Sequence, residues 1–296
     1  MATLKEIKTR IASVESTRKT TSAMKLISAV KLRKTQRILQ HLKPFSADLR
    51  QMVRQTVHDG DFKFHSPLLD VRKPEKVLLI VVTSNTGLCG AFNTVVLKKA
   101  LNHIKKNYEN NPDIKEISIA CFGRKAVEFF AKQPYNVVEN HIEFMANLDY
   151  DTYDKIADGW FQAFKDKTYD LVEMCSNEFV NAVTYKTNVR QRLPFNIAKP
   201  VLAEDEFPPY KMFYTPDKDR VVNKIIPMSF KIRTYMRVIE AVAAESAARM
   251  TSMHKATESA IVLQKDLQLR YNKARQAAIT REIIEITTGA EAYSTA

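Results

Sequence analysis

Glycine is scarce in this chain, and two long stretches contain no helix-breaking residue at all. Only six of the 296 residues are glycine, and neither glycine nor proline occurs in Met1–Lys43 or in Met228–Thr288. Since glycine and proline are the residues that most disfavour a helix interior, each stretch is predicted to be one helix. At about 1.5 Å per residue these helices would be roughly 65 and 90 Å long. Helices of that length need another element to cover their apolar stripes.

Long hydrophobic runs and metal-binding patterns are also missing. The longest apolar run, Val77–Val82, is far too short to span a bilayer, and the charged N-terminus is not a secretory signal. The six histidines form no HExxH pattern, and the three cysteines show no CxxC spacing. We therefore expect a soluble intracellular protein without a cofactor, metal site or transit peptide, and with three reduced, packed thiols at Cys89, Cys121 and Cys175.

Positive charge is concentrated in the first helix. The chain has a net charge of +13, and residues 1–50 hold twelve Lys or Arg against three acidic residues. Residues 237–296 hold eight basic and seven acidic residues, so the last helix is almost neutral. The first helix is predicted to face an acidic surface, nucleic acid or anionic lipid, although a merely solvated helix face explains the charge equally well.

Both terminal helices carry a seven-residue repeat, which predicts that they pair as an antiparallel coiled coil standing clear of a globular middle. Small, flexible or polar side chains fill much of each seam, which is typical of a slim shaft whose outer faces also meet partners. The first seam is Leu4, Ile7, Ile11, Val14, Arg18, Thr21, Lys25, Ser28, Leu32, Thr35, Leu39 and Leu42. The second is Met236, Ile239, Ala243, Ser246, Met250, Met253, Thr257, Ala260, Gln264, Leu267, Tyr271, Ala274 and Ala278, after which the apolar register drifts to Ile279, Ile283 and Ile286.

The middle of the chain alternates strands with helices, which predicts a Rossmann-like α/β domain with a mostly parallel sheet. The apolar run at 76–83 indicates a strand covered on both faces. Further strands are expected at 117–122, 171–179 and 183–192, the last two as a hairpin, with helices at 91–108, 124–132 and 152–167. The predicted organisation is a helix at 1–57, an α/β domain at 75–205, a connection at 206–227 and a helix at 228–290 that pairs with 1–57.

One turn resembles a phosphate-binding loop. Gly87-Leu88-Cys89-Gly90 lies between a predicted strand and helix, but its spacing is neither GxGxxG nor that of a P-loop. A structural turn or a protein-contact loop is favoured over phosphate binding. Cys89 at a helix N-terminus has no base near it in the sequence, so a packed thiol is favoured over a nucleophile. The acidic stretch Asp149, Asp151 and Asp154 opens a helix and needs no catalytic role. The residues provide no convincing active site.

Three segments resemble the gamma subunit of F-type ATP synthases, in the order and places expected for that family. The first helix matches at 11–24 and 30–34, the turn matches at 87–93, and the last helix matches at 247–253 and 271–285. The family usually has Ser-Asp-Arg before the Gly-Leu-Cys-Gly turn, whereas this chain has Ser84, Asn85 and Thr86. This chain therefore lacks both charges that the family carries before the turn.

The resemblance implies a rotor of bacterial type rather than a catalyst. In such a synthase the gamma coiled coil fills a ring of three alpha and three beta subunits, and its foot lies with the epsilon subunit on the ring of c subunits. Ion-driven rotation of the c-ring then drives the beta subunits through their nucleotide states. The resemblance implies no cofactor, no metal and no catalytic residue in this chain, and a peripheral position on the cytoplasmic face of the inner membrane.

The resemblance also supplies candidate contact residues. Arg275 and Gln276 match the contact to a beta-subunit loop, with Thr280 and Glu282 on the same turn. Met24 matches a methionine at which a charge disturbs coupling, although packing alone explains a methionine at a seam. Lys98 matches a second basic contact to beta by its spacing from the turn at Gly87, Leu88, Cys89 and Gly90. From the residues themselves we predict shallow electrostatic contacts to beta by Lys31, Arg33 and Lys34.

Two other classes of protein stay open at this point. A basic coiled-coil nucleic-acid-binding or scaffold protein explains the charged first helix but not the nearly neutral last one. A Rossmann-like enzyme with helical dimerisation arms would bind a nucleotide or small molecule in its middle domain.

Overall fold

A computed structural model describes residues 3–58, 67–109, 111–195, 214–215 and 217–294. The chain forms two compact units, one from residues 29–248 and one from residues 1–28 and 249–296. The helices α1 (Leu4–His58) and α6 (Lys218–Ser294) each contribute to both units. This confirms the two long terminal helices that the sparse glycine and proline predicted.

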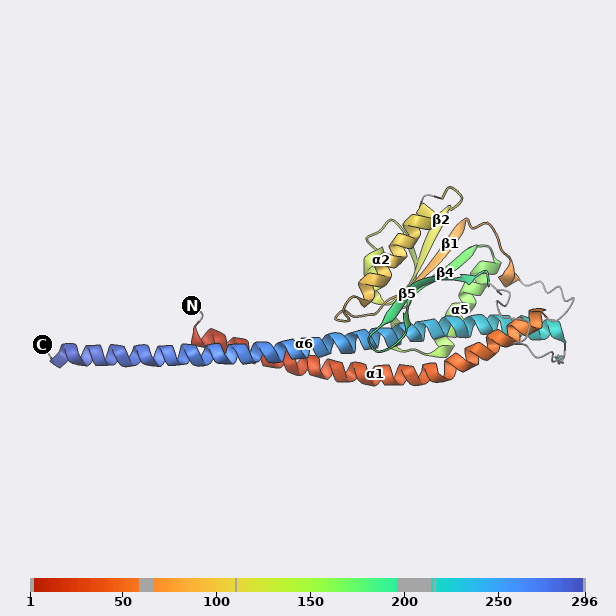
Figure 1. The fold of residues 1–296 in the computed structure, drawn as a ribbon. Coiled ribbons are helices and arrows are strands. Elements are labelled where there is room, and N and C mark those ends of the chain that lie inside the picture. Colours follow the sequence, from red (N-terminus) through yellow and green to blue (C-terminus); the bar gives the residue numbers. More distant parts are fainter. Residues whose placement is uncertain (1–2, 59–66, 110, 196–213, 216, 295–296) are drawn as a thin grey trace. The chain divides into compact units, whose positions relative to one another are not determined.

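The unit at 29–248 is built around one five-stranded sheet in the order β3-β2-β1-β4-β5 (Figure 1). The strands are β1 (Lys76–Val82), β2 (Glu116–Phe122), β3 (Asn136–Asn140), β4 (Leu171–Phe179) and β5 (Tyr185–Leu193). The first four are parallel, and β5 is antiparallel to β4. The mostly parallel sheet and the final hairpin are as predicted.

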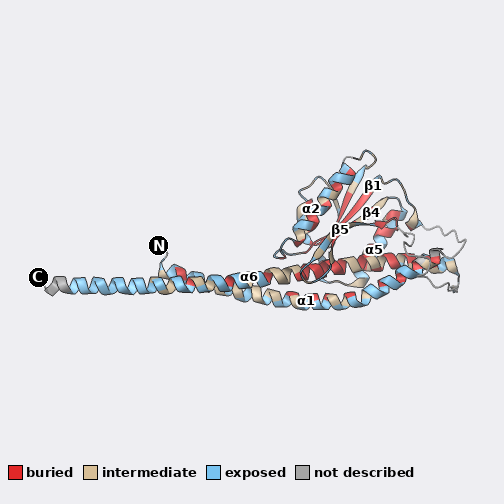
Figure 2. Cartoon of the chain, in the orientation of Figure 1, coloured by how far each residue is buried: buried red, intermediate tan, exposed pale blue. Residues whose placement is uncertain are grey.

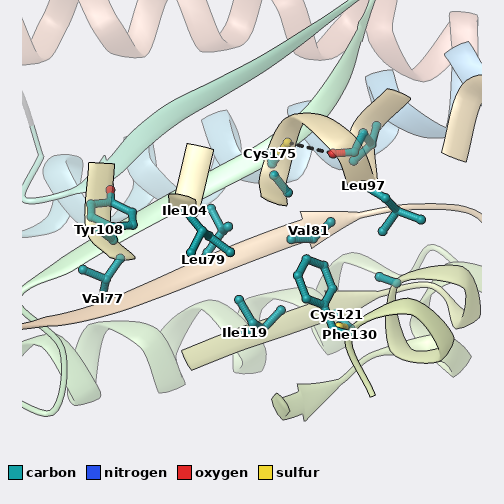
Figure 3. Packing of buried hydrophobic residues seen from close by; sticks show 13 residues of the cluster. Val77, Leu79, Val81, Leu97, Ile104, Tyr108, Ile119, Cys121, Phe130 and Cys175 are labelled. Carbon is teal, nitrogen blue, oxygen red and sulfur yellow. Dashed lines mark hydrogen bonds between the residues drawn. The ribbon is translucent and has the colours of Figure 1, made fainter. Parts of the chain in front are cut away.

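One face of this sheet packs against α2 (Phe92–Ile104) and α3 (Arg124–Phe130). Because side chains alternate along a strand, Val77, Leu79 and Val81 of β1 point to that face. They meet a cluster from the two helices and the neighbouring strands, and Figure 3 shows its packing. All six residues from Val77 to Val82 are fully buried, which confirms the strand covered on both faces.

A second layer is formed by α5 (Tyr150–Lys165) and the first part of α6. Phe161 of α5 packs against Phe230 of α6 with ring centroids 4.6 Å apart. Lys231 of α6 bonds Asp154 and Asp158 at 2.9 and 2.8 Å. Trp160 of α5 reaches Phe122 at the end of β2, so α5 contacts both the sheet and α6. The Asp149 carboxylate accepts a hydrogen bond from the Thr152 amide and caps α5, a structural role as expected.

Several elements differ from the sequence prediction. The strand β3 and the short helices η1 (Pro67–Leu69) and α4 (Ile142–Ala146) were not predicted. The helix expected to end at 108 ends at Ile104, followed by a π-helical turn, η2 (Lys105–Glu109). Of the connection predicted at 206–227, residues 206–213 lie outside the described residues, and residues 218–227 belong to α6. Pro227 lies inside that helix, so a proline there does not mark its start.

Within each unit, α1 and α6 lie antiparallel. In the unit at 29–248, Lys31 pairs with Glu245 and Lys43 with Glu240. In the other unit, Thr257 donates a hydrogen bond of 2.8 Å to the Thr21 hydroxyl. All the predicted seam residues of α1, from Leu4 to Leu42, are buried or half-buried, which confirms the seven-residue repeat in this helix.

Candidate partner-contact surfaces

The basic side chains Lys31, Arg33 and Lys34 all lie exposed on α1, in the unit at 29–248. Lys31 Nζ lies 3.6 Å from a carboxylate oxygen of Glu245, which is largely buried on α6. About half of the Lys31 side chain is still accessible, so this pair leaves room for an outside contact. The sequence missed Glu245 as a partner because the seven-residue repeats predict antiparallel pairing but not the register that brings residues 31 and 245 together.

A buried ion network lies next to this surface. Arg237 of α6 bonds Glu178 of β4 and, at 2.6 Å, Glu240 one helical turn away. Burial raises the pKa of Glu178, but the charges of Arg237 and Arg190 outweigh this effect and hold that pKa below its ordinary value. At Glu240 burial dominates, and the pKa stays above its ordinary value despite Arg237 and Lys43. One arginine therefore holds two carboxylates between β4 and α6.

Met24 belongs to the unit made from residues 1–28 and 249–296, where it is half-buried on α1. Residues near Met24 in the sequence make polar contacts between the two helices. Lys25 Nζ lies 3.3 Å from His254 Nδ1, and the Thr21 hydroxyl accepts a hydrogen bond from Thr257. The seam around Met24 is therefore partly polar, as its polar residues predicted.

The last part of α6 has no cover within the described chain. Every side chain from Arg275 to Ala290 is exposed, and Figure 2 shows this length of the helix in pale blue. Arg275, Gln276, Thr280 and Glu282 all belong to this bare segment. Large apolar side chains share it, namely Ile279, Ile283, Ile284 and Ile286, each about half exposed or more. Such a helix end is suited to contact another chain. The predicted seam position Ala278 also lies there, so the seam ends at Ala274.

The turn at Gly87–Gly90 presents one apolar side chain to solvent and buries another. Leu88 is 66% exposed and has a positive φ of 64°, an uncommon conformation for a residue with a side chain. Cys89 is fully buried and packs with Phe92 and with Ala244 of α6. The Asn93 side chain donates to Cys89 Sγ at 3.3 Å. These contacts fit a packed thiol and a turn that displays Leu88.

The residues that replace the family's charged pair form structural hydrogen bonds. Asn85 accepts a bond of 3.1 Å from the Arg124 amide at the start of α3 and donates one of 2.9 Å to the Ile142 carbonyl of α4. Ser84 bonds Asn93 across the turn. Asn85 thus ties the turn to two helices, a role that no pattern in the sequence indicated.

Lys98 lies exposed on α2 and belongs to the unit at 29–248 together with Lys31, Arg33 and Lys34. Arg275, Gln276, Thr280, Glu282 and Met24 belong to the other unit. The candidate contact residues therefore divide into two sets. All but the half-buried Met24 are exposed.

Metal-binding geometry is not found among the described residues. They contain no group of three or more His, Cys, Asp or Glu side chains suited to a metal ion. Burial raises the pKa of the Cys121 and Cys175 thiols to about 12, so neither is a ready nucleophile. None of the described helices has a stretch apolar and long enough to cross a membrane.

Comparison with known proteins decides the family. A family model described as ATP synthase matches residues 3–293. The gamma chain of ATP synthase from Christiangramia forsetii is 38% identical over 294 residues, covering 99% of this chain and all of that relative. The gamma chain from Geobacter metallireducens is 37% identical, covering 98% of this chain and 99% of the relative. The chain belongs to the ATP synthase gamma chain family.

Solved structures support the fold assignment. The Tetrahymena thermophila mitochondrial ATP synthase, as central stalk with c-ring, gives a match with TM-score 0.54 at 20% identity, covering 80% of this chain and 98% of that chain. A Euglena gracilis mitochondrial ATP synthase chain gives 0.51 at 19% identity, covering 92% and 95%. The resemblance that the three sequence segments carried is confirmed over the whole gamma chain, and no comparison supports the nucleic-acid-binding alternative.

Proposed function

We propose that this gamma chain is the central rotor stalk of a bacterial F-type ATP synthase. It couples rotation of the c-ring to the conformational changes of the catalytic beta subunits and carries no active site itself. The observation that carries the proposal is the match to bacterial gamma chains, which covers 98–99% of this chain at 37–38% identity.

The bare end of α6 supports a position inside a ring of other subunits. Residues 275–290 are exposed on every side, and they include four isoleucines. Since an isolated helix with exposed isoleucines loses the benefit of burying them, a surrounding surface would stabilise it. We assign that surface to the alpha and beta subunits, three of each, with Arg275, Gln276, Thr280 and Glu282 as beta contacts.

The second set of contacts lies in the unit at 29–248. Lys31, Arg33 and Lys34 would meet acidic loops of beta, and Lys98 would add a further basic contact. Exposed ion pairs are usually worth about 1 kcal/mol or less, so they are made and broken easily as a shaft turns. Deep hydrophobic contacts at every angle would instead hold the rotor in place.

The α/β domain is assigned to the foot of the stalk, beside the epsilon subunit and the c-ring. This placement makes the chain a peripheral protein of the cytoplasmic membrane face. The exposed Leu88 at the Gly87–Gly90 turn is suited to a protein contact, which is the role we give to that turn.

Affinity purification from gently solubilised membranes tests the proposal. A tag on this chain should recover a large ATPase containing alpha, beta, epsilon and c subunits, and membranes from cells with the untagged chain serve as control. Recovery of nucleic acid without any ATPase subunit, in a salt-dependent manner, would instead favour the nucleic-acid-binding alternative.

A further inference from the structure

Arg192 stands at an irregularity of the sheet. In the β4–β5 pair, Val172 lies opposite Leu193 and Glu173 lies opposite Gln191, so Arg192 is an extra residue with no partner across the strands. Such a β-bulge turns a side chain out of the regular alternation and often occurs beside a functional site. The neighbouring Arg190 is about half exposed and pairs with Glu178, whereas Arg192 is buried.

The buried guanidinium of Arg192 lacks a counter-charge among the described residues. Arg192 is only 8% exposed, and its Nε has no hydrogen-bond partner in the part of the chain that the structure describes. The buried Tyr153 hydroxyl lies close to Arg192 and beside the Thr234 side chain. Glu178 and Glu240, the carboxylates beside Arg237, are already held by Arg237, Arg190 and Lys43.

The electrostatics of the site favour an anion. Burial, followed by the charges of Arg237 and Arg233, lowers the pKa of Arg192 to about 9. An arginine in a protein stays protonated, so this shift expresses the cost of keeping a buried cation among other cations. A bound negative charge would remove that cost.

A cavity of about 50 Å³ adjoins this guanidinium. Its wall includes Arg233, whose guanidinium carbon stacks 5.1 Å from the centre of the Phe195 ring. The other lining residues are Gln191, Arg192, Phe195, Phe230 and Thr234, all within the unit at 29–248. The cavity therefore combines one buried arginine, a second arginine and apolar walls.

We propose that this cavity is a binding site for a small oxyanion of the phosphate class, held by Arg192 with Arg233 beside it. The planar fork of arginine donors matches two oxygens of such an anion, which a spherical halide cannot offer. The site goes beyond the proposed rotor function and does not depend on it. Its occupancy would stabilise the contact between β5 and α6.

Thermal unfolding of the full chain with inorganic phosphate, at ionic strength held constant with sodium chloride, tests the site. At phosphate about tenfold above its Kd, the midpoint should rise by about 2 to 3 °C. Arg192→Met should abolish the rise, and without phosphate this variant should be at least as stable as the unaltered chain, because the buried charge is gone. Arg190→Gln is the matched control, because Arg190 lies two residues earlier on the same strand and is exposed. This variant should show the same rise of the midpoint with phosphate.

Two further variants keep the test decisive. Should Arg192→Met fail to fold, Arg192→Lys retains the charge but loses the fork, and phosphate affinity should fall about tenfold. No phosphate effect on the unaltered chain, or an equal effect on Arg192→Met, overturns the proposal. A third variant, E204Q/D205N/E206Q, neutralises three carboxylates that lie outside the described residues. A phosphate response seen only in this variant would overturn the proposal, because the chain's own carboxylates would then occupy the cavity.

Discussion

Gly123 is the residue whose backbone most restricts substitution. It joins β2 to α3 with a φ of +98°, and an added Cβ would lie 2.4 Å from the Thr83 carbonyl oxygen. Gly87, in the exposed turn, has no atom within 4 Å of such a Cβ and no positive φ. Two glycines thirty-six positions apart therefore differ completely in the side chains they tolerate.

The matched pair Gly123→Ala and Gly87→Ala tests this difference by urea unfolding. Gly123→Ala should lower the free energy of unfolding by about 3 kcal/mol or more, through strain and collision with Thr83. Gly87→Ala should leave that free energy unchanged or raise it by up to about 1 kcal/mol, because alanine restricts the unfolded chain. Similar losses for the two variants would contradict the assigned backbone conformations.

Arg275 is the exposed residue on which the proposed beta contact depends most. Arg275→Ala should reduce the rate of ATP synthesis by the assembled enzyme about fivefold, because one surface contact worth about 1 kcal/mol is lost. Arg270→Ala removes another exposed arginine, whose partner Asp266 lies on the same helix, and should have little effect. Synthesis in inverted membrane vesicles measures both, and equal losses would argue against a specific role for Arg275.

At the scale of elements, β4 and α6 are held together by an ion network that the sequence did not reveal. Arg237→Met should destabilise the chain by about 3 to 5 kcal/mol at pH 7, because Glu178 and Glu240 would stay buried without their cation. Arg190→Met, at a side chain about half exposed, should cost much less.

The destabilisation of Arg237→Met should shrink as the pH falls. The pKa of Glu240 already lies above its ordinary value, and loss of Arg237 would raise it further. When the pKa of a carboxyl is higher in the folded than in the unfolded chain, its charged form destabilises the fold. This loss of stability is present above the folded pKa and disappears as the pH falls and the carboxyl is protonated. Denaturant unfolding at pH 7 and pH 5 measures this, and a larger penalty at pH 5 would contradict the assignment.

The pairing of α1 and α6 in the unit made from residues 1–28 and 249–296 depends on few buried side chains. Leu267 is 5% exposed at a seam position, while Leu269, two residues later, is 67% exposed. Leu267→Ala should cost about 2 to 4 kcal/mol, and Leu269→Ala less than about 0.5 kcal/mol. Thermal unfolding followed by circular dichroism distinguishes the two variants. If Leu267→Ala left the stability unchanged, the predicted seam register would be wrong.

At the scale of the whole molecule, charge distribution is the feature that most distinguishes α1 from α6. The combined variant K31Q/R33Q/K34Q removes three positive charges and should weaken ATP-driven proton pumping by about fivefold or more, since each lost contact is worth up to about 1 kcal/mol. The chain itself should fold normally because all three side chains are exposed.

Two controls separate this coupling effect from other causes. K155Q/K165Q/K167Q removes the same charge from exposed positions at α5 and should leave pumping unchanged. Glu245→Gln breaks the internal pair with Lys31 without altering the exposed charges. Unchanged pumping in K31Q/R33Q/K34Q, or an equal loss in the α5 variant, would count against beta contacts at the basic surface.

The amino-acid sequence by itself determined the two long helices, the seam of α1, the buried strand β1 and the family. These features depend on residues close together in the chain: the absence of glycine and proline, a repeat of seven, a run of apolar residues and contiguous motifs. The short strand β3 was missed because its polar sequence, Asn136–Asn140, becomes a strand only by pairing with the edge of β2.

Only the tertiary structure decided which charges are balanced and which are not. Arg237 meets Glu178 across 59 positions of sequence, Asn85 joins two helices, and the bulge in β5 buries Arg192. Lys and Arg look alike in a sequence whether they lie in water, in an ion pair or beside a cavity. Their energetic role is set by distance and burial, because the Coulomb energy and the cost of desolvation depend on neighbours that folding brings together.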